Sequence, residues 1–177
     1  SMIKKFIRKI LGVKNPDDSI DQGKASAKKN KPKVLSAKEH GIDPDLVSNN
    51  AIRVTQTLQD NGFKAFIVGG AVRDLLLGVK PKDFDVATNA TPEQVKRLFR
   101  RAFIIGRRFQ IVHVMFGQDL IEVTTFRGAA KHEAPKDEHG RVLRDNTFGE
   151  QHEDAVRRDF TINAMYYDPA SQTVLDY

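Results

Sequence analysis

The sequence has 177 residues, of which 40% are hydrophobic and 29% are charged, a balance that is typical of a globular domain and excludes a wholly disordered chain. It has no cysteine, which excludes disulfides and thiolate metal sites and is compatible with a reducing cytoplasm. No apolar run approaches the ~20 residues that a membrane span needs.

The net charge of +6 is unevenly distributed along the chain. Residues 1–40 contain eleven Lys or Arg and four Asp or Glu, so the remainder is close to neutral. We therefore expect a basic, flexible arm over residues 1–40 and a globular domain over residues 41–177. A basic arm favours contact with a polyanion, either nucleic acid or an anionic membrane surface at the edge of the cytoplasm, and docking to a protein is the alternative.

The arm is expected to begin with a short basic amphipathic helix. Its apolar positions recur at helical spacing, with Lys and Arg on the opposite side: Ile3, Phe6, Ile7, Ile10 and Leu11. Residues 15–37, rich in Lys, Asp and Ser, are typical of a flexible linker. Order is expected from near Ile42.

The globular part predicts alternating helices and short strands. Asp43 is expected to cap a helix that has Pro44 in its first turn and stops at Gly62. Further helices are expected over residues 71–77, 92–100 and 153–165. Strands are expected over residues 64–68, 84–87, 102–105, 111–116, 120–126, 166–168 and 173–177, the fourth and fifth of them forming a hairpin. The fold class is therefore α/β (α+β), with helices packed on a mixed sheet.

A double glycine joins a predicted strand to a predicted helix in the stretch "FIVGGAVRD" (66–74). Gly69 and Gly70 allow backbone N–H groups to approach a phosphate, and Arg73 in the first helical turn is suited to a bidentate phosphate contact. The spacing matches neither a Walker loop nor a dinucleotide fingerprint. A plain structural turn explains the glycines equally well.

Two aspartates follow in "KDFDVAT" (82–88). Residues two apart on a strand point to the same face, so the carboxylates of Asp83 and Asp85 should converge while Phe84 faces the core. Paired carboxylates repel each other unless a cation bridges them, and oxygen ligands suit Mg²⁺. Two surface aspartates on a solvated strand are the alternative.

A third carboxylate is a candidate in "LIEVTTFR" (120–127), where Glu122 alternates with apolar residues and should emerge on a polar face. It completes the site only if its strand lies beside that of Asp85. Arg127, at the end of the strand, is a candidate phosphate contact or the partner of an acid. His113, on an apolar strand, is expected to be a packed core histidine.

The motifs "GGAVRDLLLG", "KDFDVAT" and "EDAVRRDFTINAM", in this order, closely resemble the head domain of class II nucleotidyltransferases, the family of bacterial poly(A) polymerases and tRNA CCA-adding enzymes. The resemblance covers residues from about 35 to 177 and implies a polymerase-beta-like nucleotidyltransferase palm. It implies that Asp83 and Asp85 hold two Mg²⁺ ions, and Glu122 remains the candidate that would complete this catalytic set. It also implies that Gly69, Gly70 and Arg73 hold the triphosphate and that Asp154 and Arg157 recognise the ribose, with Arg158, Asp159 and Asn163 in the same motif. The candidate nucleotide-binding set is completed by two residues of neighbouring positions, Asp74 and Arg127.

The stretch "IIGRRFQIVHVMFG" (104–117) is similar to the poly(A) polymerase branch of the family. This similarity implies template-independent addition of AMP from ATP to RNA 3′ ends. CCA addition to tRNA is the alternative within the family, and a non-catalytic RNA-binding module on the same fold is the alternative outside catalysis. The family continues beyond the position of Tyr177 into a neck helix that reads the base, so we expect the chain to be a fragment whose base selection and full RNA grip lie elsewhere.

Overall fold

The structure of the chain is a computed structural model that describes residues 31–128, 148–157 and 164–177. Two expected segments, the amphipathic helix and the linker up to residue 30, lie outside the described residues, as do residues 129–147 and 158–163. No helix within the described ranges is both long and apolar enough to cross a bilayer.

The described residues form one eight-stranded sheet in the order β1-β8-β7-β2-β3-β6-β5-β4. The central strands β3 and β6 pair in parallel, whereas every other pair of neighbours is antiparallel. The strands are β1 (Lys33–Leu35), β2 (Ala65–Val68), β3 (Phe84–Thr88), β4 (Ala102–Ile105), β5 (Ile111–Phe116), β6 (Asp119–Thr125), β7 (Met165–Asp168) and β8 (Thr173–Asp176). The predicted mixed α/β sheet is confirmed.

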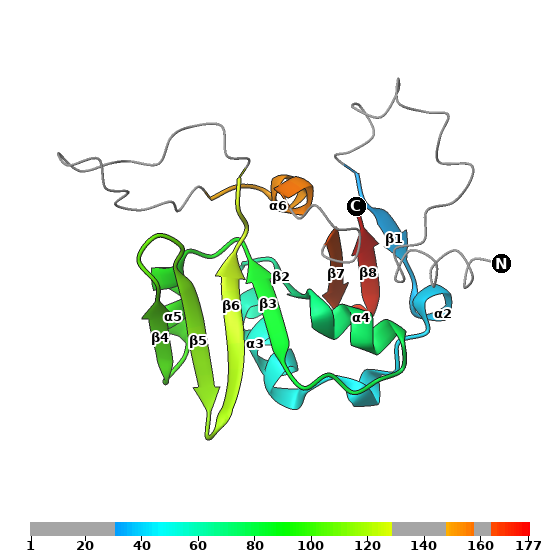
Figure 1. The fold of residues 1–177 in the computed structure, drawn as a ribbon, viewed down its shortest axis with the longest axis horizontal. Helices are drawn as coiled ribbons and strands as arrows, with labels where there is room; N and C mark the ends of the chain where they lie inside the picture. Colours follow the sequence, from blue (N-terminus) through cyan, green and yellow to red (C-terminus); the bar gives the residue numbers. More distant parts are fainter. Residues whose placement is uncertain (1–30, 129–147, 158–163) are drawn as a thin grey trace.

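Helices cover the two faces of the sheet unequally (Figure 1). Helices α3 (Asn49–Asp60), α4 (Gly70–Leu76) and α5 (Pro92–Leu98) pack on one face, where their apolar side chains form the main core with inward residues of the strands. On the other face, α6 (Gln151–Arg157) contributes Ala155 to a smaller cluster with Phe126 and Tyr166. Among the described helices, none covers β5 and β4 on this second face, and Figure 1 shows these strands from that open side.

Local signals account for most of the predicted elements. Thr91 caps α5 with a reciprocal capping box to Gln94, and Pro92 occupies the first turn. The α5 helix ends at Leu98, two residues before the predicted end. Phe84 is 5% exposed and lies in the main core, which confirms its predicted orientation.

Two predictions near the start of the domain are wrong. Order begins before Ile42, because β1 pairs with β8 and is followed by α2 (Ala37–His40). Asp43 caps a single 3₁₀ turn (Pro44–Leu46), and Ser48 caps α3, its hydroxyl accepting a hydrogen bond from the Ala51 N–H at 3.2 Å. Two capping residues in succession divide what the apolar spacing predicted as one helix.

The predicted helix 153–165 is also placed differently. The α6 helix begins at Gln151, and Met165 belongs to β7. β7 pairs with both β2 and β8, so these long-range strand contacts determine the conformation of Met165. The helical pattern in the sequence is local and carries no information about the strands β2 and β8 with which β7 pairs.

Candidate active site

The predicted carboxylates meet on the face of the sheet that α6 partly covers. Asp85 on β3 lies directly opposite Glu122 on β6, and Glu122 lies opposite His113 on β5. Residues opposite each other in neighbouring strands point to the same face, so these three half-buried side chains form a row across the sheet. The condition stated for Glu122, that its strand lies beside that of Asp85, is fulfilled.

Asp83 is exposed and lies one residue before β3. It is two residues from Asp85, with the buried Phe84 between them. Hard oxygen donors of this kind suit Mg²⁺, and the residues therefore fit the predicted ion in chemistry. In the described ranges, no group of three His, Asp or Glu side chains is close enough together to hold a metal ion. Within the described residues, Asp83, Asp85 and Glu122 therefore do not form a three-carboxylate cluster in this conformation.

The glycine turn lies against this site. Gly69 has φ 71° and ψ −143°, a conformation that only glycine adopts without strain, and a Cβ added there would lie 3.7 Å from Asp85 Oδ2. A Cβ added at Gly70 would lie 3.5 Å from Arg73 Nη2. The guanidinium of Arg73 thus folds back over the turn, on the same short segment that touches the Asp85 carboxylate.

Arg73 is about half exposed and makes an ion pair with Asp74, with 3.3 Å between Nε and Oδ1. An exposed ion pair of this kind contributes little to stability, on the order of 0–1 kcal/mol, so the guanidinium can exchange Asp74 for an incoming anion at small cost. Asp74 therefore orients the Arg73 guanidinium in the absence of substrate. In the predicted nucleotide site, Arg73 would bind phosphate and Asp74 would position Arg73.

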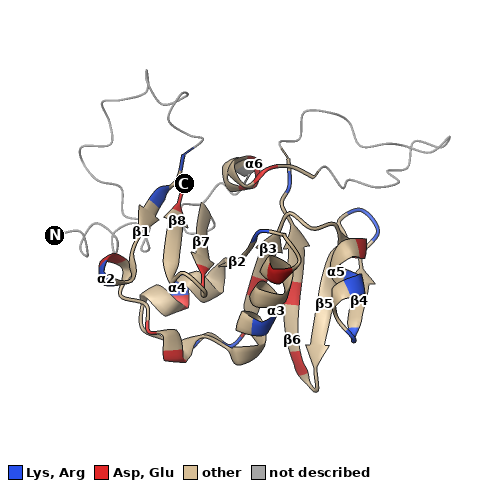
Figure 2. Ribbon diagram, turned by 180° about the vertical axis from the view of Figure 1, so that it is seen from behind, with Lys and Arg blue, Asp and Glu red and all other residues tan. Residues whose placement is uncertain are grey.

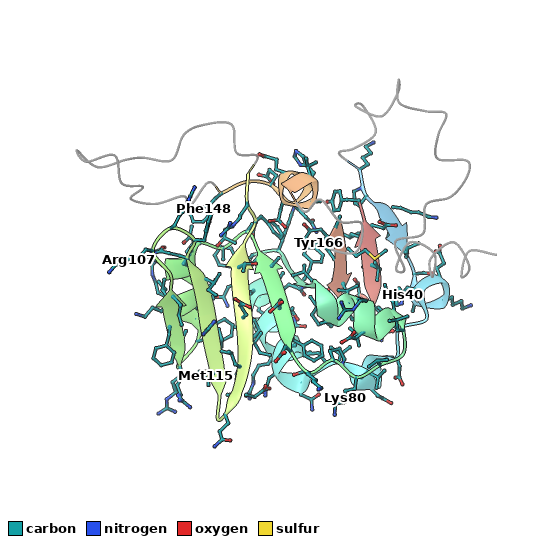
Figure 3. The ribbon with its side chains drawn as sticks, in the orientation of Figure 1. His40, Lys80, Arg107, Met115, Phe148 and Tyr166 are labelled. Carbon is teal, nitrogen blue, oxygen red and sulfur yellow. The ribbon has the colours of Figure 1, made fainter. Side chains whose placement is uncertain are left out.

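Helix α6 is attached to the sheet through Asp154, whose side chain is only 3% exposed. One carboxylate oxygen accepts a hydrogen bond from the Arg127 backbone N–H at 2.9 Å, and the other accepts one from the Tyr166 hydroxyl at 2.5 Å. Figure 3 shows Tyr166 on β7, below α6. Asp154 was predicted to bind ribose, and its position shows that it also ties together α6, the end of β6 and β7.

Arg127 directly follows β6, where its guanidinium carbon lies 4.0 Å from the centroid of the Phe109 ring. Cation–π contacts of this geometry are favourable by about 0.5–2 kcal/mol, depending on exposure. This contact attaches the β4–β5 loop to the end of the strand that carries Glu122. The sequence pattern did not identify it, because Phe109 and Arg127 are 18 positions apart and come together only through the hairpin.

His113 is not a core histidine, which corrects the prediction. Its neighbours Val112 and Val114 are buried on the core side of β5, whereas His113 is half-buried on the opposite face beside Glu122. The period of two in "IVHVMF" contains this signal, because a strand with Val112 and Val114 inward must place His113 outward. The hairpin register then decides that its neighbour is Glu122.

The remaining predicted residues cannot be placed. The side chain of Arg157 is not described, and Arg158, Asp159 and Asn163 lie outside the described residues. The site that the structure brings together therefore consists of the glycine turn with Arg73 and Asp74, the carboxylates of β3 and β6, and the Arg127–Asp154 contact.

The family of this chain follows from comparisons with known proteins. A family model described as "Poly A polymerase head domain" matches residues 65–177. "Poly(A) polymerase I" of Escherichia coli O6:H1 is 47% identical over an alignment 180 positions long, which covers 97% of this chain and 37% of that protein. "Poly(A) polymerase I" of Haemophilus influenzae is 51% identical over an alignment 150 positions long, which covers 81% of this chain and 33% of that protein.

Among solved structures, the CCA-adding enzyme of Bacillus stearothermophilus in complex with CTP has a TM-score of 0.54 and 36% identity, and the match covers 71% of this chain and 28% of that one. The chain thus spans about a third of the length of the relatives that it matches. The matched region contains the glycine turn, both aspartates and Glu122, and on this basis the chain belongs to the poly A polymerase head-domain family of nucleotidyltransferases.

Proposed function

We propose that the protein containing this chain adds AMP from ATP to RNA 3′ ends without a template, and releases pyrophosphate. The observation that carries the proposal is the placement of Asp85 beside Glu122 on one open face, with the Gly69–Gly70 turn against the Asp85 carboxylate. Relatives named poly(A) polymerase I at 47% and 51% identity support the choice of reaction.

Each part of the site has a distinct task in this reaction. Arg73 neutralises triphosphate charge above the glycine turn, where backbone N–H groups are accessible. Asp83 and Asp85 are the residues that would hold Mg²⁺, which when bound lowers the pKa of the RNA 3′ hydroxyl and stabilises the leaving pyrophosphate. Glu122 adds negative charge beside Asp85 and so strengthens the preference of this face for a cation.

Asp154 and Arg127 define the far side of the nucleotide in this proposal. Because Asp154 is held by the Arg127 backbone and by Tyr166, its carboxylate has one fixed orientation. A fixed acceptor is suited to a ribose hydroxyl, since little side-chain freedom is lost when it binds. Arg157, Arg158, Asp159 and Asn163 are proposed to contribute to the same nucleotide site.

The test is transfer of labelled AMP to an oligoadenylate primer by the full-length protein in the presence of Mg²⁺. Asp83→Asn and Asp85→Asn should each lower the rate by about 100-fold or more, because the charge that holds the cation is lost. Asp60→Asn, at an exposed position at the end of α3, removes an equal charge away from the site and should keep the parent rate. Retained transfer in both site variants would refute the assignment.

CCA addition is the second candidate, because the chain also matches a CCA-adding enzyme structure at 36% identity. The two activities are separated by offering a tRNA that lacks its terminal CCA together with ATP and CTP. Polyadenylation predicts a tail made from ATP alone, whereas CCA addition predicts incorporation of both nucleotides. If the fold served only as a binding module, RNA binding would persist without Mg²⁺-dependent ATP binding.

A further inference from the structure

A second concentration of positive charge lies inside the globular part of the chain. Residues 94–118 contain six Lys or Arg and no Asp or Glu, although residues 41–177 as a whole are nearly neutral. The whole stretch is described, and it forms the end of α5, β4, β5 and the loops between them. Like charges gathered in so short a stretch repel one another, and an anionic partner would relieve this repulsion.

The arginines of this stretch lie at both ends of the edge strand β4. Arg100 and Arg101 directly precede it, and Arg107 and Arg108 follow it after Gly106. Gly106 has φ 99°, and a Cβ there would lie 2.2 Å from the Phe109 carbonyl oxygen, so the turn that presents the second pair requires glycine. Figure 2 shows basic positions at both ends of β4 and on α5, and Figure 3 shows the Arg107 side chain projecting outward.

Five of the six cations in this stretch are available to a partner. None of Lys96, Arg97, Arg100, Arg101 and Arg107 forms an ion pair with a carboxylate in the described parts of the chain. Arg101 donates a hydrogen bond to the Gly117 carbonyl at 3.2 Å, and all five residues are exposed. Their charge is therefore not neutralised by any carboxylate within the described residues.

Between the two arginine pairs, β4 presents apolar side chains to the open face. Phe103 is 52% exposed and Ile105 is 44% exposed, although large apolar side chains such as these are usually buried. Phe103 lies opposite His113, so it continues the row that starts at Asp85 and passes through Glu122. The exposed ring and the catalytic carboxylates thus share one face and one line across the sheet.

From these observations we infer that the edge formed by Arg100, Arg101, Phe103, Arg107 and Arg108, here called the β4 edge, binds the single-stranded 3′ segment of the RNA that is to be extended. Phe103 stacks on a base, and the arginines bind the backbone phosphates on either side. The inference rests on the proposed function in that it names where the RNA of that reaction lies.

The dimensions agree with this partner. Three strand spacings separate β3 from β4, or about 14 Å at ~4.8 Å per spacing. At about 3.4 Å per nucleotide of a stacked strand, this distance corresponds to roughly four nucleotides. An RNA whose 3′ hydroxyl lies at Asp85 therefore reaches Phe103 with its fourth or fifth nucleotide from the end. The arginines also protect an edge strand from pairing with other chains, but that role explains neither the exposed ring nor its alignment with the carboxylates.

Binding of fluorescein-labelled oligoadenylate to the chain, measured by anisotropy over a series of salt concentrations, tests the electrostatic part. Arg100→Gln/Arg107→Gln should reduce the slope of log K against log salt by about 1.4, since each phosphate contact to a single strand contributes about 0.7. Over the decade from 1 M to 0.1 M salt, this corresponds to about 25-fold weaker binding. Lys38→Gln/Lys64→Gln removes the same charge from exposed positions outside the β4 edge and should stay within about 2-fold of the parent.

Phe103 gives an independent readout. Phe103→Ala should weaken oligoadenylate binding about 5-fold or more while leaving the salt slope unchanged, because stacking releases no counterions. Phe103→Tyr keeps the aromatic face and should restore binding. Circular dichroism and thermal unfolding verify that both variants are folded, which is expected because the side chain is exposed. Affinity should level off at an oligonucleotide length of about five.

Several results would overturn the inference. Equal weakening by the two charge variants would show that only net charge matters, and unchanged binding in Phe103→Ala would exclude stacking. Binding to anionic phosphatidylserine vesicles that competes with RNA and depends on Phe103 would identify a membrane surface instead. The readouts are separable from those of the proposed function, since Asp85→Asn should abolish AMP transfer but retain RNA binding. RNA binding that depends on the β4 edge without any AMP transfer would refute the proposed function and leave this inference standing.

Discussion

The two adjacent glycines that seat the proposed triphosphate should respond in opposite directions to the same substitution. Gly69 has φ 71° and ψ −143°, outside the range of L-residues, whereas Gly70 begins helix α4 and has no positive φ. Gly69→Ala forces either backbone strain or a shift of the turn, at a cost of about 1–3 kcal/mol. Gly70→Ala reduces the freedom of the unfolded chain and should change stability by between 0 and about 1 kcal/mol in the favourable direction.

Contacts of the added methyl group do not reverse this difference. At Gly69 the Cβ would lie 3.7 Å from Asp85 Oδ2, and at Gly70 it would lie 3.5 Å from Arg73 Nη2, both at ordinary van der Waals distance. The two variants should therefore differ by about 1–4 kcal/mol, almost all of it from backbone conformation. For a chain of this length, about 2–4 °C in melting temperature corresponds to each kcal/mol.

The measurement is urea unfolding followed by circular dichroism. The midpoints of the parent and both variants are compared where the free energy of unfolding depends on urea concentration with the same slope. A lower midpoint for Gly69→Ala together with an equal or higher midpoint for Gly70→Ala is the expected result. If the two substitutions had the same effect, the conformation of the turn described above would be wrong. If both were neutral, the loop would adapt freely and would not be a preformed seat for phosphate.

Three further predictions concern single side chains. Tyr166→Phe removes the hydrogen bond to the Asp154 carboxylate and should lower the free energy of unfolding by about 1.5–3 kcal/mol, measured by urea unfolding. Burial is the main cause that raises the pKa of Tyr167 above its ordinary value of 10.0. The stability that the neutral Tyr167 side chain contributes is therefore present below pH 10 and is lost as the pH rises further. Urea unfolding between pH 8 and 11 measures this loss. Glu122→Gln removes a like charge opposite Asp85 and should raise thermal stability by about 0.2–1 kcal/mol while lowering Mg²⁺-dependent AMP transfer.

Each of these predictions has a decisive contrary outcome. An unchanged midpoint in Tyr166→Phe would mean that Asp154 is not anchored by the hydroxyl. If Tyr167→Phe lost stability at alkaline pH to the same extent as the parent, another group would be responsible. Tyr177 is the first to test, because burial raises its pKa as well. Lower stability in Glu122→Gln would show that this carboxylate has a favourable partner rather than an unfavourable neighbour.

Much of the local structure follows from the sequence, because its causes are local. The alternation of "LIEVTTF" requires Ile121 and Val123 to be buried and Glu122 to face the other way, and the structure agrees. Thr91 with Pro92 specifies the start of a helix through hydrogen bonds within four residues. The glycine pair and the two aspartates are likewise recognisable as a motif, since their chemistry depends on a spacing that the chain itself fixes.

The relations between distant segments were decided by the tertiary structure. Nothing within "KPKVL" predicts a strand, yet residues 33–35 become β1 because β8 offers a free edge. The alternation along β5 turns His113 away from the core, and the β5–β6 register then decides that its neighbour is Glu122. The parallel pairing of β3 with β6 then brings Asp85 and Glu122 together across 37 positions of sequence. The sequence alone therefore identified the candidate residues for the chemistry. The pairing of strands, which depends on contacts between distant parts of the chain, decided which of these candidates lie side by side.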